Sequence, residues 1–215
     1  MNLSFYLVAS KGNFSTQTFL NIVKEAIRGG VTTVQLREKE LSAKEFYDLA
    51  LSLKRLCDEK KIPLIINDRL DIALAIDAYG VHLGQDDLPL KEARKILSKK
   101  KIIGLSTKTK EQIDEAYKNG AYYVGCGAIY KSHTKDSSVI GLDSFKNLCK
   151  HIKNEKYKLK TVAIGGINED KIKDFKDIQT DALAFSSAIM QSKNPYKTCI
   201  KIKKELQTFI KTPIN

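Results

Sequence analysis

Short apolar runs alternate with longer amphipathic segments along the whole chain. In the longer segments apolar residues recur three and four positions apart, which predicts helices at residues 16–28, 43–60, 110–119 and 144–153. The short runs predict eight strands, at residues 5–9, 32–36, 63–67, 80–83, 101–105, 122–125, 161–164 and 181–185. Eight strand–helix units in 215 residues favour an α/β fold of the (β/α)8 TIM-barrel type over an open doubly wound sheet. We therefore expect a single domain over residues 1–215.

The second predicted strand runs into an unusually polar stretch. Side chains of a strand alternate between its two faces, so Thr33, Gln35, Arg37 and Lys39 share one face. A guanidinium and an ammonium close together on one face suit a phosphate or a diphosphate. A solvated face of an edge strand has the same pattern, and this stretch alone leaves both interpretations open.

Carboxylates follow two neighbouring predicted strands. Asp68 stands between Asn67 and Arg69 after the third strand, and Asp87 comes after the fourth. Carboxylates are the hard oxygen ligands that Mg²⁺ uses when it holds a diphosphate. Capping of the helices that follow explains either carboxylate equally well, so this alternative also stays open.

Hydroxyl and cationic side chains lie after the fifth and sixth predicted strands. Ser106 has a hydroxyl that suits either a phosphate oxygen or a helix cap. Residues 125–138 are the longest irregular segment, which is typical of a lid or binding loop. Within it, Ser132, Thr134 and Lys135 could close over an anionic substrate, although a solvated loop would look similar.

Glycine and serine pairs follow the last two predicted strands. In barrels, the loops after strands seven and eight often bind phosphate, and Gly165–Gly166 and Ser186–Ser187 have the required residue types. The alternative is a tight turn followed by a helix cap. The histidines show no metal-ligand spacing, and we expect His82 to be an interior or wall residue of the barrel.

Composition and charge describe an ordinary globular protein. The hydrophobic fraction is 42% and the net charge is +12, but the excess lysines are scattered and are not interleaved with aromatic residues. We therefore expect small-molecule substrates and no nucleic-acid partner. No apolar run is long enough to span a bilayer and no targeting segment is evident, so we expect a cytoplasmic protein without membrane association. The four cysteines lack paired spacing, which favours reduced thiols over a zinc site or disulfides.

Taken together, the motifs resemble those of the thiamine-phosphate synthase family over residues 3–195. The matching pieces are residues 35–39, 67–69, 81–87, 103–106, 123–127 with 134–135, 163–167 and 187–189. The resemblance implies a TIM-barrel transferase that joins hydroxymethylpyrimidine diphosphate to a thiazole phosphate, with Mg²⁺ as cofactor and pyrophosphate as the second product. A homo-oligomer is compatible with it.

The resemblance also implies a role for individual residues. Asp68 and Asp87 would hold Mg²⁺, Ser106 would contact the departing pyrophosphate, and Tyr6 would lie near the pyrimidine. The pyrimidine diphosphate would be bound by Gln35, Arg37, Lys39, Asn67 and Lys135. The thiazole phosphate would rest on Ser132, Thr134, the backbone N–H of Gly166 and the turn formed by Ser187, Ala188 and Ile189. In a dissociative substitution, Arg37, Lys39, Lys135 and Ser106 would act on the leaving group.

The sequence departs from the family pattern at four positions. Lys108 stands where the family usually has His, Ala128 and Lys131 stand where Pro is usual or common, and Ser132 replaces a common Thr. Lys108 adds a cation near the expected diphosphate. The alternatives to a synthase are a thiazole tautomerase of the same fold and a non-catalytic binder of phosphates or nucleic acid.

Overall fold

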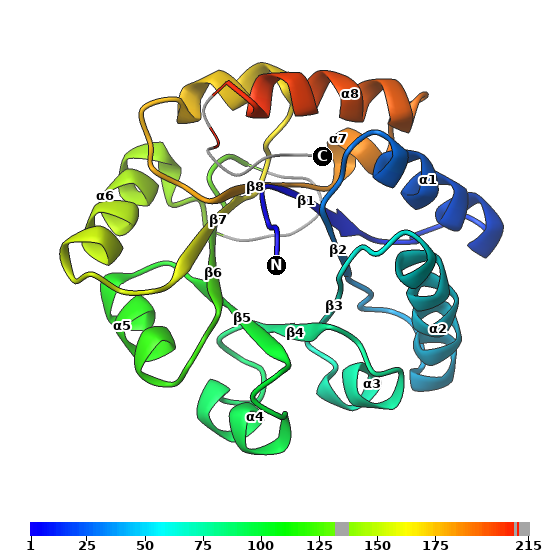
Figure 1. Cartoon of the computed structure of the whole chain (residues 1–215), viewed down its shortest axis with the longest axis horizontal. Helices are drawn as coiled ribbons and strands as arrows, with labels where there is room; N and C mark the ends of the chain where they lie inside the picture. Colours follow the sequence, from blue (N-terminus) through cyan, green and yellow to red (C-terminus); the bar gives the residue numbers. More distant parts are fainter. Residues whose placement is uncertain (132–137, 209, 211–215) are drawn as a thin grey trace.

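The protein is a closed barrel of eight parallel strands in sequence order, surrounded by helices (Figure 1). The structure, a computed structural model, describes residues 1–131, 138–208 and 210. The strands are β1 (Phe5–Ala9), β2 (Thr33–Leu36), β3 (Leu64–Asn67), β4 (Gly80–Leu83), β5 (Ile102–Thr107), β6 (Tyr123–Gly127), β7 (Lys160–Ile164) and β8 (Ala182–Phe185). Pairing of β1 with β8 closes the ring, which confirms the predicted (β/α)8 fold.

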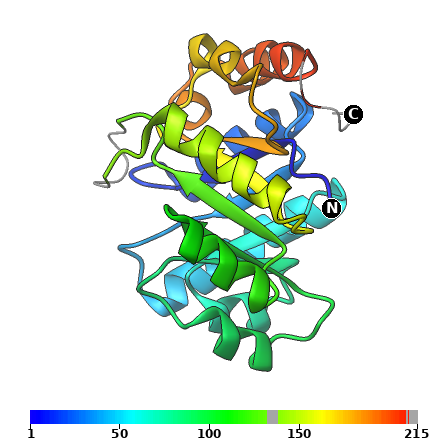
Figure 2. The same cartoon turned by 90° about the vertical axis from the view of Figure 1, so that its left-hand side faces the viewer.

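The helices form the outer layer, as the side view also shows (Figure 2). They are α1 (Thr16–Arg28), α2 (Ala43–Glu59), α3 (Leu70–Ala75), α4 (Leu90–Ile96), α5 (Lys110–Lys118), α6 (Gly141–Asn154), the 3₁₀ helix η1 (Glu169–Phe175), α7 (Ser187–Met190) and α8 (Pro195–Leu206). Ser42 and Glu45 form a capping box that fixes the start of α2. The prediction for α6 was three residues short at its start, because the helix begins at Gly141 in place of Ser144.

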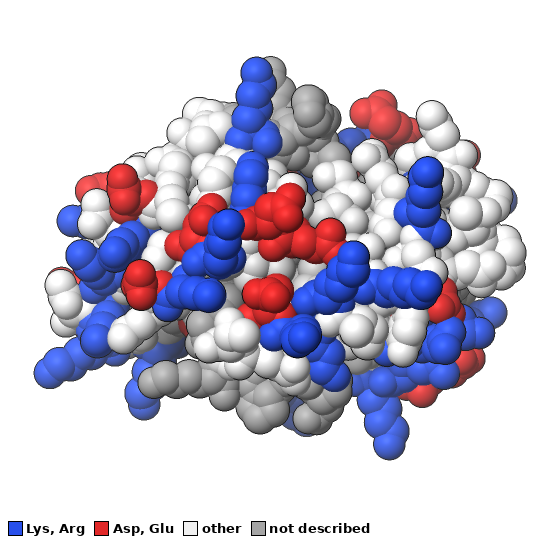
Figure 3. All heavy atoms as spheres, turned by 90° about the horizontal axis from the view of Figure 1, so that it is seen from above, with Lys and Arg blue, Asp and Glu red and all other residues white. Residues whose placement is uncertain are grey.

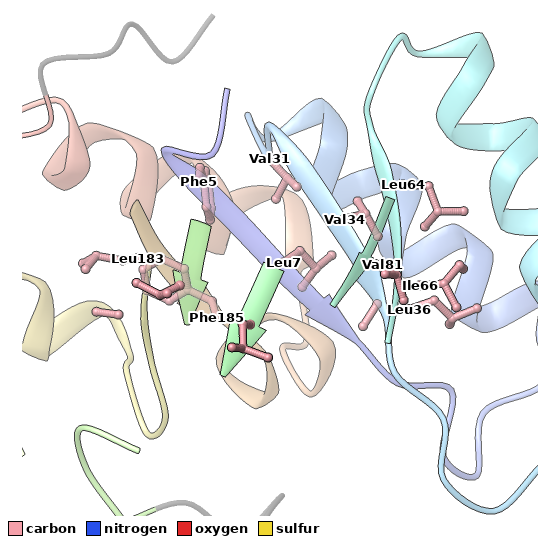
Figure 4. Packing of buried hydrophobic residues seen from close by; sticks show 14 of the residues in the cluster. Phe5, Leu7, Val31, Val34, Leu36, Leu64, Ile66, Val81, Leu183 and Phe185 are labelled. Carbon is pink, nitrogen blue, oxygen red and sulfur yellow. The ribbon is translucent and has the colours of Figure 1, made fainter. Parts of the chain in front are cut away.

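Two hydrophobic layers follow from the alternation of side chains along each strand. Phe5 and Leu7 of β1 belong to the large cluster between the strands and the helices, part of which is visible in Figure 4. Tyr6 and Val8 point the other way and pack in a smaller cluster inside the barrel, together with Tyr123 of β6. The barrel interior is therefore filled in part by tyrosines, which bring hydroxyl groups into a space that usually holds branched aliphatic side chains.

All strands run in the same direction, so their carboxyl ends meet at one end of the barrel. The segments that follow the strands place polar side chains at this end, where active sites of such barrels lie. Among the described residues, no helix has both the length and the apolar character that crossing a membrane requires.

Candidate active site

A cavity of about 810 Å³ opens at the carboxyl ends of the strands. Every strand, or the turn directly after it, contributes to its wall. From β1 to β4 and their turns come Tyr6, Gln35, Arg37, Lys39, Asn67, Asp68, His82 and Asp87, and from β5 to β8 come Ser106, Lys108, Tyr123, Gly166 and Ser187. The fold thus brings together most of the site residues expected from the sequence and described by the structure.

The polar stretch after β2 faces this cavity. β2 pairs with β1 and with β3, and Gln35 is only 3% exposed, so the interpretation as a solvated edge strand was wrong. Regular strand pairing ends at Leu36, but the backbone N–H of Arg37 still donates to the carbonyl of Ala9 at 2.9 Å. This bond continues the strand direction and keeps Arg37 on the cavity side.

Two carboxylates from β3 and β4 lie against each other at the cavity. Asp68 and Asp87 are hydrogen-bonded through their side chains, and Lys39 forms an ion pair with Asp68. Burial and the neighbouring Asp68 raise the pKa of Asp87. Burial opposes a lowered pKa at Asp68, yet its bonds to Asp87 and Lys39 outweigh burial and place that pKa below the ordinary range.

The capping alternative for these carboxylates does not hold. Helix α3 begins after Arg69 and α4 after Pro89, and neither helix start has a side-chain cap. Asp87 instead accepts a hydrogen bond from the backbone N–H of Gly84 at 2.6 Å, which closes the turn after β4. Asp68 takes a left-handed backbone conformation, φ 60°, directly after β3. A non-glycine residue in this conformation is uncommon and is found mostly at functional or tightly constrained positions.

The carboxylate pair suits a divalent cation. Two neighbouring acidic groups offer hard oxygen ligands, and burial together with the adjacent Asp68 raises the pKa of Asp87. Within residues 1–131 and 138–208, no group of three or more histidine, cysteine, aspartate or glutamate side chains is placed to hold a metal. Two carboxylates are what Mg²⁺ uses when substrate phosphates and water complete its coordination.

The turn after β7 is built on two glycines with positive φ. Gly165 has φ +104° and Gly166 has φ +65°, and a Cβ on Gly166 would lie 2.6 Å from the carbonyl oxygen of Lys131. The glycines therefore let this turn pack against the backbone that follows β6. A close approach to an anion was the expected reason for glycine here, and the structure adds this packing requirement.

The short helix α7 presents only part of its first turn to the cavity. Ser187 lines the cavity, whereas Ala188 is not among the lining residues. The Ile189 side chain is fully buried in the core and its backbone N–H donates to the carbonyl of Ser186 at 3.0 Å. Ser132, Thr134 and Lys135 lie outside the described residues, so their expected roles stay predictions.

Comparison with known proteins identifies the family. A sequence model described as thiamine monophosphate synthase matches residues 5–189. The chain belongs to this family. The thiamine-phosphate synthase of Campylobacter jejuni (strain RM1221) is 47% identical over 206 residues, which cover 96% of this chain and 95% of the relative. The synthase of Clostridium botulinum (strain Eklund 17B / Type B) is 43% identical over 95% of this chain and 94% of its own length.

A solved structure agrees with this assignment. The chain resembles the thiamine phosphate pyrophosphorylase from Pyrococcus furiosus with a TM-score of 0.86 and 32% identity, over 97% of both chains. Membership of the thiamine monophosphate synthase family makes the chain an enzyme, a transferase of thiamine biosynthesis. Small-molecule substrates follow from the family.

One departure from the family pattern has a visible structural consequence. Lys108 lines the same cavity as Arg37 and Lys39, and its ammonium donates to the hydroxyl of Ser138 at 2.8 Å. It therefore connects the end of β5 to the segment that leads into α6. Ala128 is nearly buried and its carbonyl accepts from the backbone N–H of Ile140 at 2.8 Å.

Sequence reasoning missed one contact inside the cavity and one contact beside it. Tyr123 of β6 reaches His82 of β4 inside the barrel, with 2.9 Å between its hydroxyl and the imidazole Nδ1. His82 lines the cavity as the predicted wall residue, but its hydrogen bonds were not foreseen. Outside the cavity lining, the carboxylate of Glu38 accepts a hydrogen bond from the backbone N–H of Lys11 in the loop after β1, a contact that was not predicted. For the contact between Tyr123 and His82, the available signal was that both residues occupy inward-facing positions of their strands.

Charge on the molecular surface is mixed where it can be seen. On the face in Figure 3, lysine and arginine side chains surround and alternate with acidic ones. Mixed signs of this kind differ from the continuous basic stripe that typifies nucleic-acid binding. On this face the positive side chains are therefore interspersed with acidic ones.

Proposed function

We propose that this enzyme transfers the pyrimidine methylene group of hydroxymethylpyrimidine diphosphate to the nitrogen of a thiazole phosphate, releasing pyrophosphate. The observation that supports it best is one cavity in which Arg37 and Lys39 stand beside the Asp68–Asp87 pair. Gly166 and Ser187 line another part of the same cavity and suit the second, singly phosphorylated substrate.

Asp68 and Asp87 would hold Mg²⁺, which when bound supplies positive charge to the diphosphate. The guanidinium of Arg37 offers a planar fork for two phosphate oxygens, and Lys39 offers a point charge that can move from Asp68 to the substrate. Ser106 adds a hydroxyl at the end of β5, and Asn67 an amide at the end of β3. These groups stabilise the charge that develops on a departing pyrophosphate.

The proposed route is a dissociative substitution in which the electron-rich pyrimidine carries the positive charge after the carbon–oxygen bond breaks. The thiazole nitrogen then forms the new carbon–nitrogen bond. This route requires no protein nucleophile, and the state of the cysteine thiols agrees with that. All four are buried, and burial raises the pKa of Cys126 to about 11, so that thiol stays neutral at physiological pH. Alignment of the two substrates in one cavity supplies the remaining acceleration.

The test is to incubate the enzyme with both substrates and Mg²⁺ and to quantify thiamine phosphate and pyrophosphate. We expect the two products in equal amounts, their loss on chelation, and recovery on adding Mg²⁺ back. Arg37→Ala should lower kcat about 100-fold, because the fork acts on charge that appears in the transition state. Lys197→Ala, which removes an exposed cation from α8, is the matched control and should retain full activity.

The alternatives make different predictions for the same incubation. A thiazole tautomerase would form no thiamine phosphate and would not need the pyrimidine diphosphate. A non-catalytic binder would form neither product. Either outcome would contradict the proposed reaction.

A further inference from the structure

A chain of hydrogen bonds crosses the inside of the barrel and ends at Ser106. Gln35 of β2 donates through Nε2 to the Tyr6 hydroxyl of β1 at 2.9 Å, and the hydroxyls of Tyr6 and Tyr123 are 2.8 Å apart. The Tyr123 hydroxyl lies 2.9 Å from His82 Nδ1, and His82 Nε2 lies 2.9 Å from Ser106 Oγ. Each of these residues thus comes from a different strand.

The barrel is shaped to accommodate this chain. A Cβ on Gly104 of β5 would lie 2.1 Å from the Tyr123 ring, and one on Gly125 of β6 would lie 3.0 Å from the His82 ring. Glycine at these two strand positions therefore leaves room for the rings, which stack with centroids 5.4 Å apart. Gln35, Tyr6, Tyr123 and His82 are all buried, and burying polar groups is costly unless each one finds a partner.

The donor is fixed at one end of the chain, at Gln35. The Gln35 amide nitrogen only donates, so the Tyr6 oxygen accepts from it. Either of the Tyr6 and Tyr123 hydroxyls can donate to the other, and the proposal below requires that the Tyr6 O–H points to the oxygen of Tyr123. In that direction the Tyr123 O–H points to Nδ1 of His82, and the neutral Nε2–H tautomer of His82 donates to Ser106 Oγ. Burial raises the pKa of both tyrosines well above the usual value, so both keep their hydroxyl hydrogens.

The direction decides what Ser106 can do. With the Nε2–H tautomer of His82, the Ser106 oxygen accepts from His82, and its own hydrogen is left for a partner in the cavity that Ser106 lines. Gln85 holds the same residue from the other side by donating to the Ser106 carbonyl at 2.6 Å. A serine hydroxyl rotates freely unless a neighbour fixes it, and a donor oriented before the reaction needs no reorganisation when charge develops.

We propose that His82 is a positioning residue, held by Tyr123, that orients the Ser106 hydroxyl as a hydrogen-bond donor to the departing diphosphate. This inference rests on the proposed function, since it requires a diphosphate leaving group in the cavity. It assigns Gln35 a second task besides substrate binding, because the direction of the whole chain starts from its amide.

Tyr123→Phe tests the chain while keeping the ring that fills the barrel. It removes the hydroxyl that fixes His82, so kcat should fall about tenfold while KM for both substrates changes by less than about twofold. Tyr122→Phe is the matched control: Tyr122 directly precedes Tyr123, and its hydroxyl lies 3.5 Å from the Met1 carbonyl. Thermal unfolding of both variants should show that each stays folded at the assay temperature. A Tyr123→Phe enzyme with unchanged kcat would overturn the proposal.

A double-mutant cycle separates positioning from general damage to the barrel. If His82 and Tyr123 act through Ser106, the Tyr123→Phe substitution should have little further effect on kcat in a Ser106→Ala background. Independent, multiplying losses would mean that the tyrosine supports the barrel without orienting Ser106, and would overturn the proposal.

The direction of the chain can be measured without substrates. Nitrogen-15 NMR of the histidine side chains distinguishes the two neutral tautomers, and a His82→Asn spectrum assigns the signals. The proposal requires the Nε2–H tautomer at His82, and an Nδ1–H tautomer would reverse the chain and overturn it. If the unaltered protein formed no thiamine phosphate, the proposed function would fail as well; the wrong tautomer in an active enzyme would contradict only the role of His82.

Discussion

Replacing Asp87 by Asn should stabilise the fold while removing the magnesium site. The amide oxygen of Asn can still accept the hydrogen bond from Gly84, and its nitrogen can donate to Asp68, so geometry is preserved. What changes is the charge, because one of two neighbouring carboxylates becomes neutral. We therefore expect the Asp87→Asn protein to be more stable than the unaltered protein when Mg²⁺ is absent. We also expect it to be inactive when Mg²⁺ is present, because it lacks one of the two carboxylates that would hold the metal.

The size of the effect follows from the proximity of the two carboxylates. Two like charges about 4 Å apart repel by roughly 4 kcal/mol at an effective dielectric constant near 20. Lys39 compensates part of this repulsion at Asp68, and Asp87 is only partly buried, so solvent screens much of the remainder. A gain of about 1 kcal/mol in the free energy of unfolding remains, which raises Tm by about 2–4 °C for a chain of this size.

The pKa shifts of Asp87 and Asp68 set the direction in which stability changes with pH. The folded-state pKa of Asp87 is raised above its ordinary value of 3.8, so wild-type stability from this group is fully present below that value. It is lost as pH rises through the raised pKa. The pKa of Asp68 is lowered, and its contribution is lost as pH falls through that lowered pKa. The gain from Asp87→Asn should therefore be largest near neutral pH and disappear towards pH 3.8.

Urea unfolding at several pH values, with chelator or with Mg²⁺ and pyrophosphate, measures this effect. Asp86→Asn removes a carboxylate from the same turn and should change the free energy of unfolding by less than about 0.5 kcal/mol. Mg²⁺ with pyrophosphate should stabilise the unaltered protein more than the Asp87→Asn variant, because binding to the folded state adds to its stability. A loss of stability in Asp87→Asn without metal would refute the reasoning.

Further predictions concern the β7 turn, the guanidinium and the thiols. Gly166→Ala should cost about 1–3 kcal/mol in free energy of unfolding, because its Cβ would meet the Lys131 carbonyl at positive φ. Gly12→Ala has positive φ but nothing within 4 Å, so calorimetry should find a smaller loss. Arg37→Lys should lower kcat/KM about tenfold in steady-state kinetics, since an ammonium lacks the fork, and unchanged kinetics would contradict that role. A thiol reagent should label the four buried cysteines only as the protein unfolds, and rapid labelling of the native enzyme would contradict their burial.

Much of the fold could be predicted because the barrel repeats one simple pattern. The side chains of each strand alternate between the barrel interior and the helix layer, and each long helix has an apolar stripe. The predicted limits of α1 and β1 therefore agree with the structure. The convergence of Gln35, Arg37 and Asp68 was also predictable, because parallel strands end at the same side.

The hydrophobic periodicity did not predict which side chains contact each other. The bond between Tyr123 and His82 joins residues 41 positions apart, and it depends on the space left by Gly104 and Gly125. Periodicity identifies an inward-facing residue but not the neighbour that it meets across the barrel. Ile189 shows another limit: the motif places it in the expected phosphate-binding turn, but the pattern did not predict that its side chain is buried in the core.

A crystal structure with Mg²⁺, pyrophosphate and thiamine phosphate tests the central claim most directly. We expect the metal between the carboxylates of Asp68 and Asp87, and pyrophosphate oxygens against Arg37 and Ser106. The phosphate of thiamine phosphate should lie at the turn that contains Gly166. Pyrophosphate bound outside this cavity, or a metal that contacts neither carboxylate, would contradict the account.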